Sequence, residues 1–357
     1  MVGSGSRTCG ACRRRGGRGA ILPAALLGLA IHAPLHAQTV KPHPIALTPL
    51  TTLPAPAPED FASSDWTALD KRIALADVAL APETITLYGP SDSRPAKRPT
   101  YDPDRYNTFG RRVGAVKWEF AGMLAILTAV NLPKDLHDGS SFRFHDEGLF
   151  GHDTDNVGVD KVDHAFNSYL YSDILYARLK RKAGAGFQSA LTAGLLSIAA
   201  EAYGEIYDGF EDSSGWSMQD VMFDIAGAGF SVLRNSVPGL ADKLDFRLLL
   251  TPNSHFYSYE GKEHYRQQKF LFALKLAGFE PLERTPLRFV ELETGYYASG
   301  FTPRERAEGG TPRRHVFVGL GLNVQELLFK HSDGLVGQAG RAVLTYLQLP
   351  YTSVRSN

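Results

Sequence analysis

The spacing of apolar residues along the chain changes near residue 240. Between Val113 and Leu233 apolar residues recur three and four positions apart, which is the spacing of one face of an α-helix. Between Asp245 and Phe329 several segments alternate apolar and polar residues one by one, as in a β-strand with one buried face. The pattern predicts an α+β fold, in which a helical bundle core is followed by an antiparallel β meander.

Four helices are expected in the first part, bounded by glycine, proline or capping residues. They run from Val113 to Leu132, Asp160 to Arg181, Phe187 to Tyr207 and Met218 to Leu233. Lys117 and Glu119 interrupt the apolar run of the first helix, so we interpret it as a buried core helix rather than a membrane span. Pro133 is expected to end it, because proline has no backbone N–H to donate.

Four strands are expected in the second part, with proline, glycine and charged residues in the turns between them. They cover Asp245 to Leu250, Phe270 to Leu276, Leu287 to Tyr297 and Val316 to Val324, before a last helix from Gly337 to Leu347. Alternating apolar and aromatic strands also form the walls of outer-membrane barrels. Four strands are too few to close such a barrel, so a partial, barrel-like sheet is the alternative.

The first residues of the chain have the pattern of an export signal. Arg13, Arg14, Arg15 and Arg18 precede an apolar run from Ala20 to Ile31 that is too short to span a bilayer, and Ala37 offers a small residue for cleavage. We therefore expect a signal peptide over residues 1–37 and a mature protein in the periplasm or outer membrane. Cys9 and Cys12 lie within this signal, so the mature protein is expected to have no disulfide and no cysteine metal ligand.

Three regions are expected after the signal peptide. Residues 38–112 form a proline-rich linker and irregular region, 113–240 the helical domain, and 241–357 the antiparallel β extension with its terminal helix. The formal net charge of the chain is zero, which gives no electrostatic reason to expect nucleic acid as a partner. The expected partner is the membrane or the cell envelope.

Acidic residues and one histidine form pairs at helical spacing between positions 160 and 224. The pairs are Asp160 with His164, Glu201 with Glu205, and Asp220 with Asp224, and Lys161 and Asp208 lie beside them. Residues four apart share a helix face, so each pair points one way from its helix. If the three helices pack together, the pairs meet in one site.

Asp160 with His164 is the sharpest of these pairs, and Glu201 adds to the signal. It follows the apolar run Leu195 to Ala200, where an unpaired carboxylate is costly. It must therefore be neutral, paired with a base or bound to a cation, and Lys161 and His164 are the candidate bases. No cofactor is predicted outright, but a cluster of carboxylates and histidine can hold a divalent metal ion.

The sequence leaves three functions open. The first is a non-enzymatic envelope protein whose buried polar network fixes helix packing. The second is an enzyme acting on a lipid-linked or cell-wall substrate, with His164 as base, Asp160 orienting it and Glu205 as a further catalytic candidate. The third is a protein that binds a lipid or small ligand between apolar strand faces. The chain has no His-Glu-x-x-His and no Gly-x-Ser-x-Gly motif, and helix capping explains Asp160 without any chemistry.

Three motifs resemble, in order and spacing, the YfiM-like family of predicted periplasmic lipoproteins. They are Asp160-Lys161-x-x-His164, Glu205-Ile206-Tyr207-Asp208 and Ser217-x-x-Asp220-x-x-x-Asp224-x-x-Gly227-Ala228. The resemblance covers about Phe142 to Phe230, and a more distant one points to the VanZ-like membrane domain. It implies an envelope location and assigns no activity. Two features depart from the family, because Asp224 replaces the more usual asparagine and no lipid-attachment cysteine stands at the expected cleavage point.

Overall fold

The computed structural model describes residues 104–356, apart from residues 212–213, 252–259, 331 and 333. The expected signal peptide and almost all of the expected linker lie outside these residues. Four long helices come first, followed by a sheet, so the predicted α+β order of a helical core and then an antiparallel sheet is confirmed. The helices are α3 (Phe109–Asp138), α4 (Val159–Lys182), α5 (Phe187–Phe210) and α6 (Met218–Ser236).

The sheet has six strands in the order β5-β1-β2-β3-β4-β6. The strands are β1 (Leu244–Leu250), β2 (Gln268–Lys275), β3 (Val290–Ser299), β4 (Arg313–Leu322), β5 (Leu347–Gln348) and β6 (Ser353–Ser356). All neighbours are antiparallel except β1 and β5. The short strands β5 and β6 form the two edges, so the sheet is open and is not a closed barrel. Neither edge strand was predicted, since two and four residues are too few to show alternation.

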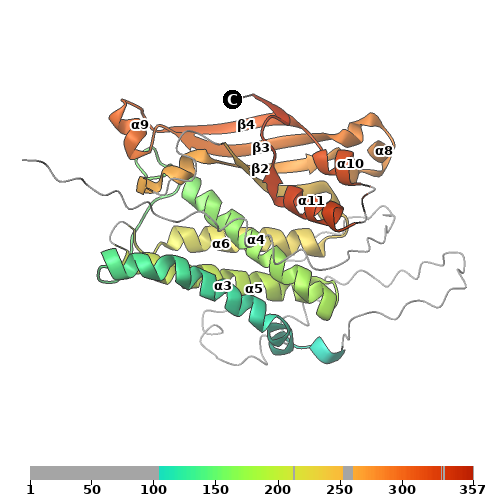
Figure 1. The fold of residues 1–357 in the computed structure, drawn as a ribbon, viewed down its shortest axis with the longest axis horizontal. Helices are drawn as coiled ribbons and strands as arrows, with labels where there is room; N and C mark the ends of the chain where they lie inside the picture. Colours follow the sequence, from blue (N-terminus) through green and yellow to red (C-terminus); the bar gives the residue numbers. More distant parts are fainter. Residues whose placement is uncertain (1–103, 212–213, 252–259, 331, 333, 357) are drawn as a thin grey trace, which may run out of the picture.

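Short helices join and flank the strands. They are α7 (Leu240–Lys243), α8 (Glu280–Glu283), α9 (Pro303–Ala307), α10 (Val324–Phe329) and α11 (Leu335–Tyr346), with 3-10 turns at Asp104–Tyr106, Glu260–Gln267, Leu276–Gly278 and Pro286–Phe289. The expected C-terminal helix is confirmed as α11, although β5 and β6 follow it. In Figure 1 the sheet forms the upper layer, α4 and α6 lie beneath it, and α5 and α3 form the lower layer.

The starts of α4 and α6 follow from local chemistry. Ser217 caps α6, because its hydroxyl accepts the backbone N–H of Asp220 at 3.3 Å. The helix α4 begins after Gly158, whose φ of 79° suits glycine, so Asp160 is not the capping residue. The explanation of Asp160 as a cap is therefore wrong, and its carboxylate is available for other contacts.

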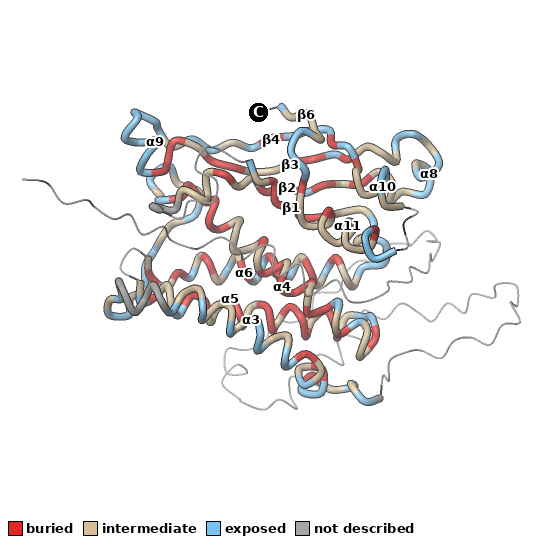
Figure 2. Tube along the Cα trace, viewed as in Figure 1, coloured by how far each residue is buried: buried red, intermediate tan, exposed pale blue. Residues whose placement is uncertain are grey.

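The helix α3 differs from its prediction in length and position. It continues through Pro133 to Asp138, so the missing backbone donor costs it a hydrogen bond without ending it. The segment Phe109–Leu132 is long and apolar enough to cross a membrane, and only 11% of its most apolar 18-residue stretch is buried inside the protein. The interpretation of α3 as a buried core helix is wrong. It packs on α5 with one side and leaves Trp118 77% exposed on the other (Figure 2).

Two apolar clusters hold the layers together. One joins α3, α4 and α5, and includes Val116, Met123, Leu175, Leu179 and Leu196. The other fixes α4 against the sheet through Phe166, whose ring lies 5.5 Å from that of Phe246 and 5.7 Å from that of Phe270. Because α4 belongs to both clusters, it is held from both sides, and the polar residues of its first turns keep fixed positions.

Candidate functional site

The helices α4, α5 and α6 bring the three predicted pairs together at one end of the bundle. Their close approach depends on Gly227, because a Cβ built there would lie 1.9 Å from the carbonyl oxygen of Ala165. The backbones of α4 and α6 are therefore in direct contact, as the small residues of α6 suggested. Gly229 has no such neighbour, so the packing role belongs to Gly227.

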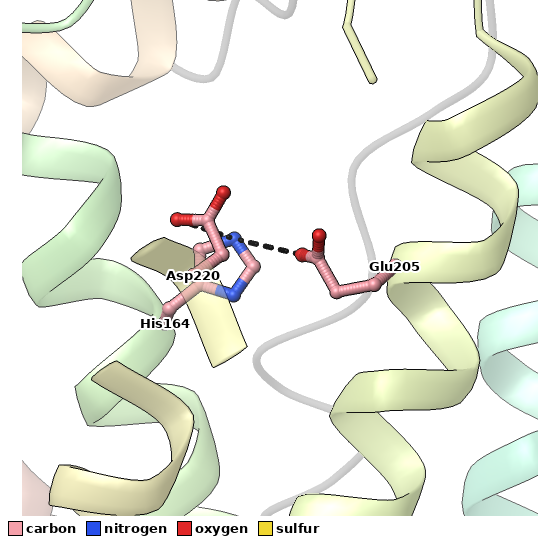
Figure 3. A group of neighbouring side chains, drawn as sticks. All are labelled: His164, Glu205 and Asp220. Carbon is pink, nitrogen blue, oxygen red and sulfur yellow. Dashed lines mark ion pairs between the residues drawn. The ribbon is translucent and has the colours of Figure 1, made fainter. Parts of the chain in front are cut away.

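His164 lies at the centre of the convergence. Its Nδ1 is 3.2 Å from Oδ1 of Asp224, and its Nε2 is 3.6 Å from Oε1 of Glu205 and 3.7 Å from Oδ1 of Asp220. Figure 3 shows Glu205 reaching from α5 toward the ring, with Asp220 beside it. The carboxylate that holds the ring is thus Asp224 of α6. Asp160 was expected to orient His164, but its carboxylate contacts Lys161 instead. The way α4 and α6 cross places Asp224, and not Asp160, against Nδ1 of His164.

Lys161 gathers a second set of carboxylates. Its Nζ contacts Glu147, lies 2.8 Å from Oδ1 of Asp220 and 3.1 Å from Oδ2 of Asp160. The same Asp220 oxygen faces His164, so Asp220 joins the two sets. Glu147 lies in the acidic loop before α4. The sequence of this loop has no periodicity, so it did not predict the contact between Glu147 and Lys161. We call the eight side chains the bundle cluster: Glu147, Asp160, Lys161, His164, Glu201, Glu205, Asp220 and Asp224.

Glu201 is buried, at 7% exposure, and its Oε1 has no hydrogen-bond partner within the described residues. The buried Oδ2 of Asp224 also has none there. Lys161, one of the two expected partners of Glu201, is engaged by other carboxylates. His164, the other, offers a ligand atom within 4.8 Å of Glu201 and Asp224, and these three form one of the groups that could hold a metal ion.

Burial controls the protonation of the cluster. Burial raises the pKa of Glu205 to about 8, although the nearby His164 charge opposes the shift. Burial also raises the pKa of Glu201 well above the usual value, and the Asp224 charge adds to the effect. The pKa of Asp220 is instead lowered, since the charges of His164 and Lys161 outweigh its burial.

The pKa of His164 shifts in the direction that its charged neighbours favour. Burial alone would lower the pKa of His164, but the hydrogen bond to Asp224 and the charges of Asp220 and Glu205 raise it well above 6.5. These neighbours therefore favour the charged, imidazolium form of His164. A general base needs the neutral form, which can accept a proton.

Two further acids lie close to the cluster. Asp208 is half-buried one turn beyond Glu205, and its charge adds to the raised pKa of that residue. Burial raises the pKa of Asp163, on α4, to about 6, and Asp163 contacts Asn167 and Gln268 rather than the cluster. The structure thus groups seven of the eight predicted site residues and leaves Asp208 at the edge.

The donor set suits a divalent cation. The described residues offer three groups whose ligand atoms all lie within 4.8 Å of one another: His164 with Glu205 and Asp220, His164 with Glu201 and Asp224, and Glu147 with Asp160 and Asp220. Carboxylate oxygen and imidazole nitrogen together bind Mn²⁺, Fe²⁺ or Zn²⁺, whereas carboxylates alone favour Mg²⁺ or Ca²⁺. The orphaned oxygens of Glu201 and Asp224 are the atoms that such an ion would satisfy.

Taken together, three packed helices around a buried histidine and carboxylate cluster define a helical domain to which the sheet is attached. Residues 146–236, which hold the whole bundle cluster, match the family model described as a predicted periplasmic lipoprotein (DUF2279). The match agrees with the YfiM-like resemblance and supports an exported envelope location. The VanZ-like resemblance stays a prediction. No curated protein and no solved structure matches the chain.

Proposed function

We propose that this exported envelope protein binds a divalent cation in the bundle cluster, and that the bound ion fixes the packing of α4, α5 and α6. The observation that carries the proposal is that Glu201 and Asp224 each have a buried, unpartnered carboxylate oxygen and each offer a ligand atom within 4.8 Å of one from His164. A buried carboxylate without a partner is costly, and a metal ion removes that cost for both residues at once.

The charge of the cluster supports the same proposal. It contains six carboxylates and two basic side chains, so negative charge remains even when Lys161 and His164 are both charged. Burial raises the pKa values of Glu147, Glu201 and Asp224, so these acids hold their protons more tightly than exposed carboxylic acids do. An ion with two positive charges would replace those protons and the proton on His164.

Direct metal titration tests the proposal. The full chain, treated with a chelator, should bind Mn²⁺ or Zn²⁺ in isothermal titration calorimetry and release protons as it does so. Glu201→Gln keeps the side-chain shape and removes the charge, and should weaken binding at least tenfold, with Asp224→Asn behaving alike. Glu119→Gln is the matched control, because Glu119 pairs with Arg178 away from the cluster.

The thermal stability of the metal-bound protein gives a second measurement. An ion present at 100 times its dissociation constant stabilises the folded state by about 2.7 kcal/mol, and at the same ion concentration this gain should fall to about 1.4 kcal/mol or less in Glu201→Gln. A chelated protein that binds none of the divalent ions, or a Glu201→Gln variant that binds as tightly as the native chain, would overturn the proposal. The enzyme hypothesis stays a prediction that the imidazolium state of His164 does not favour.

A further inference from the structure

An apolar cavity of about 360 Å³ lies between α4, α6 and the sheet. Aromatic side chains from α6 and three strands form much of its wall: Phe223, Phe230, Phe246, Phe270, Phe272 and Tyr296. None of the residues of the bundle cluster lines it, so it is a separate site. Its volume lies within the range of small-molecule pockets, about 300–1,000 Å³.

The apolar surface continues from the cavity along β4. Val316 lines the cavity, and Val318 and Leu320 follow at alternate positions, so the three side chains share one face of the sheet. They are 69%, 60% and 58% exposed. Val318 is paired across the sheet with Thr294, another residue of the cavity wall. The described elements therefore leave this part of the apolar face uncovered.

The helix α6 borders the same opening. Met222 and Leu233 lie four and seven positions from Ala226, which lines the cavity, so they share its side of the helix. Met222 is 57% and Leu233 is 53% exposed. A continuous exposed apolar surface of this kind marks a binding site in a soluble or peripheral protein.

The positively charged guanidinium of Arg314 lies at one end of this surface. Arg314 precedes Val316 by two positions on β4 and so shares its face. Its guanidinium donates to the carbonyl oxygen of Phe150 and lies 3.1 Å from Nε2 of His152, so neither of these partners is a carboxylate. No carboxylate of the described residues lies within ion-pair distance of it. Phe150 itself contacts Tyr296 and Phe223, which places this charge at the rim of the cavity.

We propose that the surface between α6 and β4 binds an anionic phospholipid. One acyl chain fills the aromatic cavity, the other lies along Val316, Val318 and Leu320, and the phosphate pairs with Arg314. The occupant follows from charge complementarity, since an apolar surface with an unpaired cation at its end suits a molecule with apolar chains and an anionic head. The envelope location supported by the family match puts such lipids within reach.

Vesicle binding by the full chain tests this site. The chain should sediment with phosphatidylglycerol vesicles and far less with phosphatidylcholine vesicles. Val318→Asp places a charge on the exposed face without disturbing the core, and should abolish sedimentation. Val336→Asp is the matched control, because Val336 is 77% exposed on α11, away from this face, and should leave binding unchanged. Arg314→Gln should weaken binding to phosphatidylglycerol about fivefold and leave phosphatidylcholine binding unaltered.

Three outcomes would overturn the assignment. Sedimentation of Val318→Asp at the native level would place membrane contact elsewhere, with the exposed side of α3 as the first alternative. Binding of a free fatty acid without binding of the vesicles would exclude a phospholipid. The native chain could instead form a dimer that Val318→Asp dissociates, and bind neither kind of vesicle. That result would show that the surface binds a second copy of the chain. Metal titration of the same variants should be unchanged, so this test is independent of the cation proposal.

Discussion

Replacing Gly227 by alanine should separate α4 from α6. The added Cβ would stand 1.9 Å from the carbonyl oxygen of Ala165, about 1.5 Å inside ordinary van der Waals contact. The obstacle is helix backbone, which cannot rotate away as a side chain can. Overpacking of this kind costs about 1–3 kcal/mol and sometimes more. Alanine regains about 1 kcal/mol over glycine through helix propensity, so a net loss of about 2 kcal/mol is expected where the helices cannot adjust.

Gly229→Ala is the matched control on the same helix. Nothing lies within 4 Å of a Cβ built at Gly229, so this variant should keep the propensity gain and become more stable by about 1 kcal/mol. Urea unfolding followed by circular dichroism measures both variants. The two should differ by about 3 kcal/mol in the free energy of unfolding, which is about 6–12 °C in melting temperature.

The same substitution should also disturb the bundle cluster. The contact between His164 on α4 and Asp224 on α6 spans the interface that Gly227 closes, so Gly227→Ala should weaken metal binding and Gly229→Ala should not. If Gly227→Ala is as stable as Gly229→Ala, then close contact between α4 and α6 does not require a glycine at position 227. If Gly227→Ala instead loses stability but binds metal with native affinity, then the glycine has no part in assembling the site.

Three more substitutions test separate features of the fold by the same unfolding assay. Ser217→Ala removes the cap of α6 and should cost about 1 kcal/mol, and no loss would mean that the capping contact carries no energy. Tyr169→Phe removes a buried hydroxyl without a partner among the described residues, so stability should hold or rise by about 1 kcal/mol; a clear loss would reveal an unseen partner. Asp245→Asn should cost about 3–5 kcal/mol at neutral pH. Burial opposes the Asp245 charge, but Lys275, Arg247 and Arg234 lower its pKa, so its contribution should begin to decline as pH falls below about 4 and should be lost only below the lowered pKa of the folded state. An Asp245→Asn penalty that stays constant as pH falls through this range would contradict this.

The sequence predicted that acids from three helices meet if those helices pack together, but not which atoms touch. Residues four apart fix the direction of a pair from its own helix, and that rule placed Glu201, Glu205 and Asp224 correctly. The partner of each depends on how the helices cross, which is set by Gly227 and by the aromatic contacts of Phe166 with the sheet. For this reason Asp224, and not Asp160, reached His164.

Two other features could not be inferred from the pattern. The helix α3 is apolar on nearly all sides, so its sequence gives no direction for a buried face, and burial was assumed where the structure has an exposed side. Glu147 belongs to a loop, where no periodicity predicts which way a side chain points. In both cases the missing information lies in tertiary contacts.

A comparison of two buried ionic clusters separates a structural network from a binding site. Behind β1, the basic residues Arg234, Arg247 and Lys275 meet three acids, Asp173, Asp245 and Glu291, and opposite charges are matched one to one. Such a network needs nothing further, and its main effect is to tie α4 and α6 to the sheet.

The bundle cluster lacks this balance. Its six carboxylates outnumber its two basic residues, and the unpartnered oxygens lie on residues that were buried despite the cost. The basic and acidic residues around β1 are equal in number, whereas those between α4, α5 and α6 are not. The difference is explained if a metal ion from outside the chain neutralises the excess negative charge of the bundle cluster. The metal titration of Glu201→Gln tests this explanation.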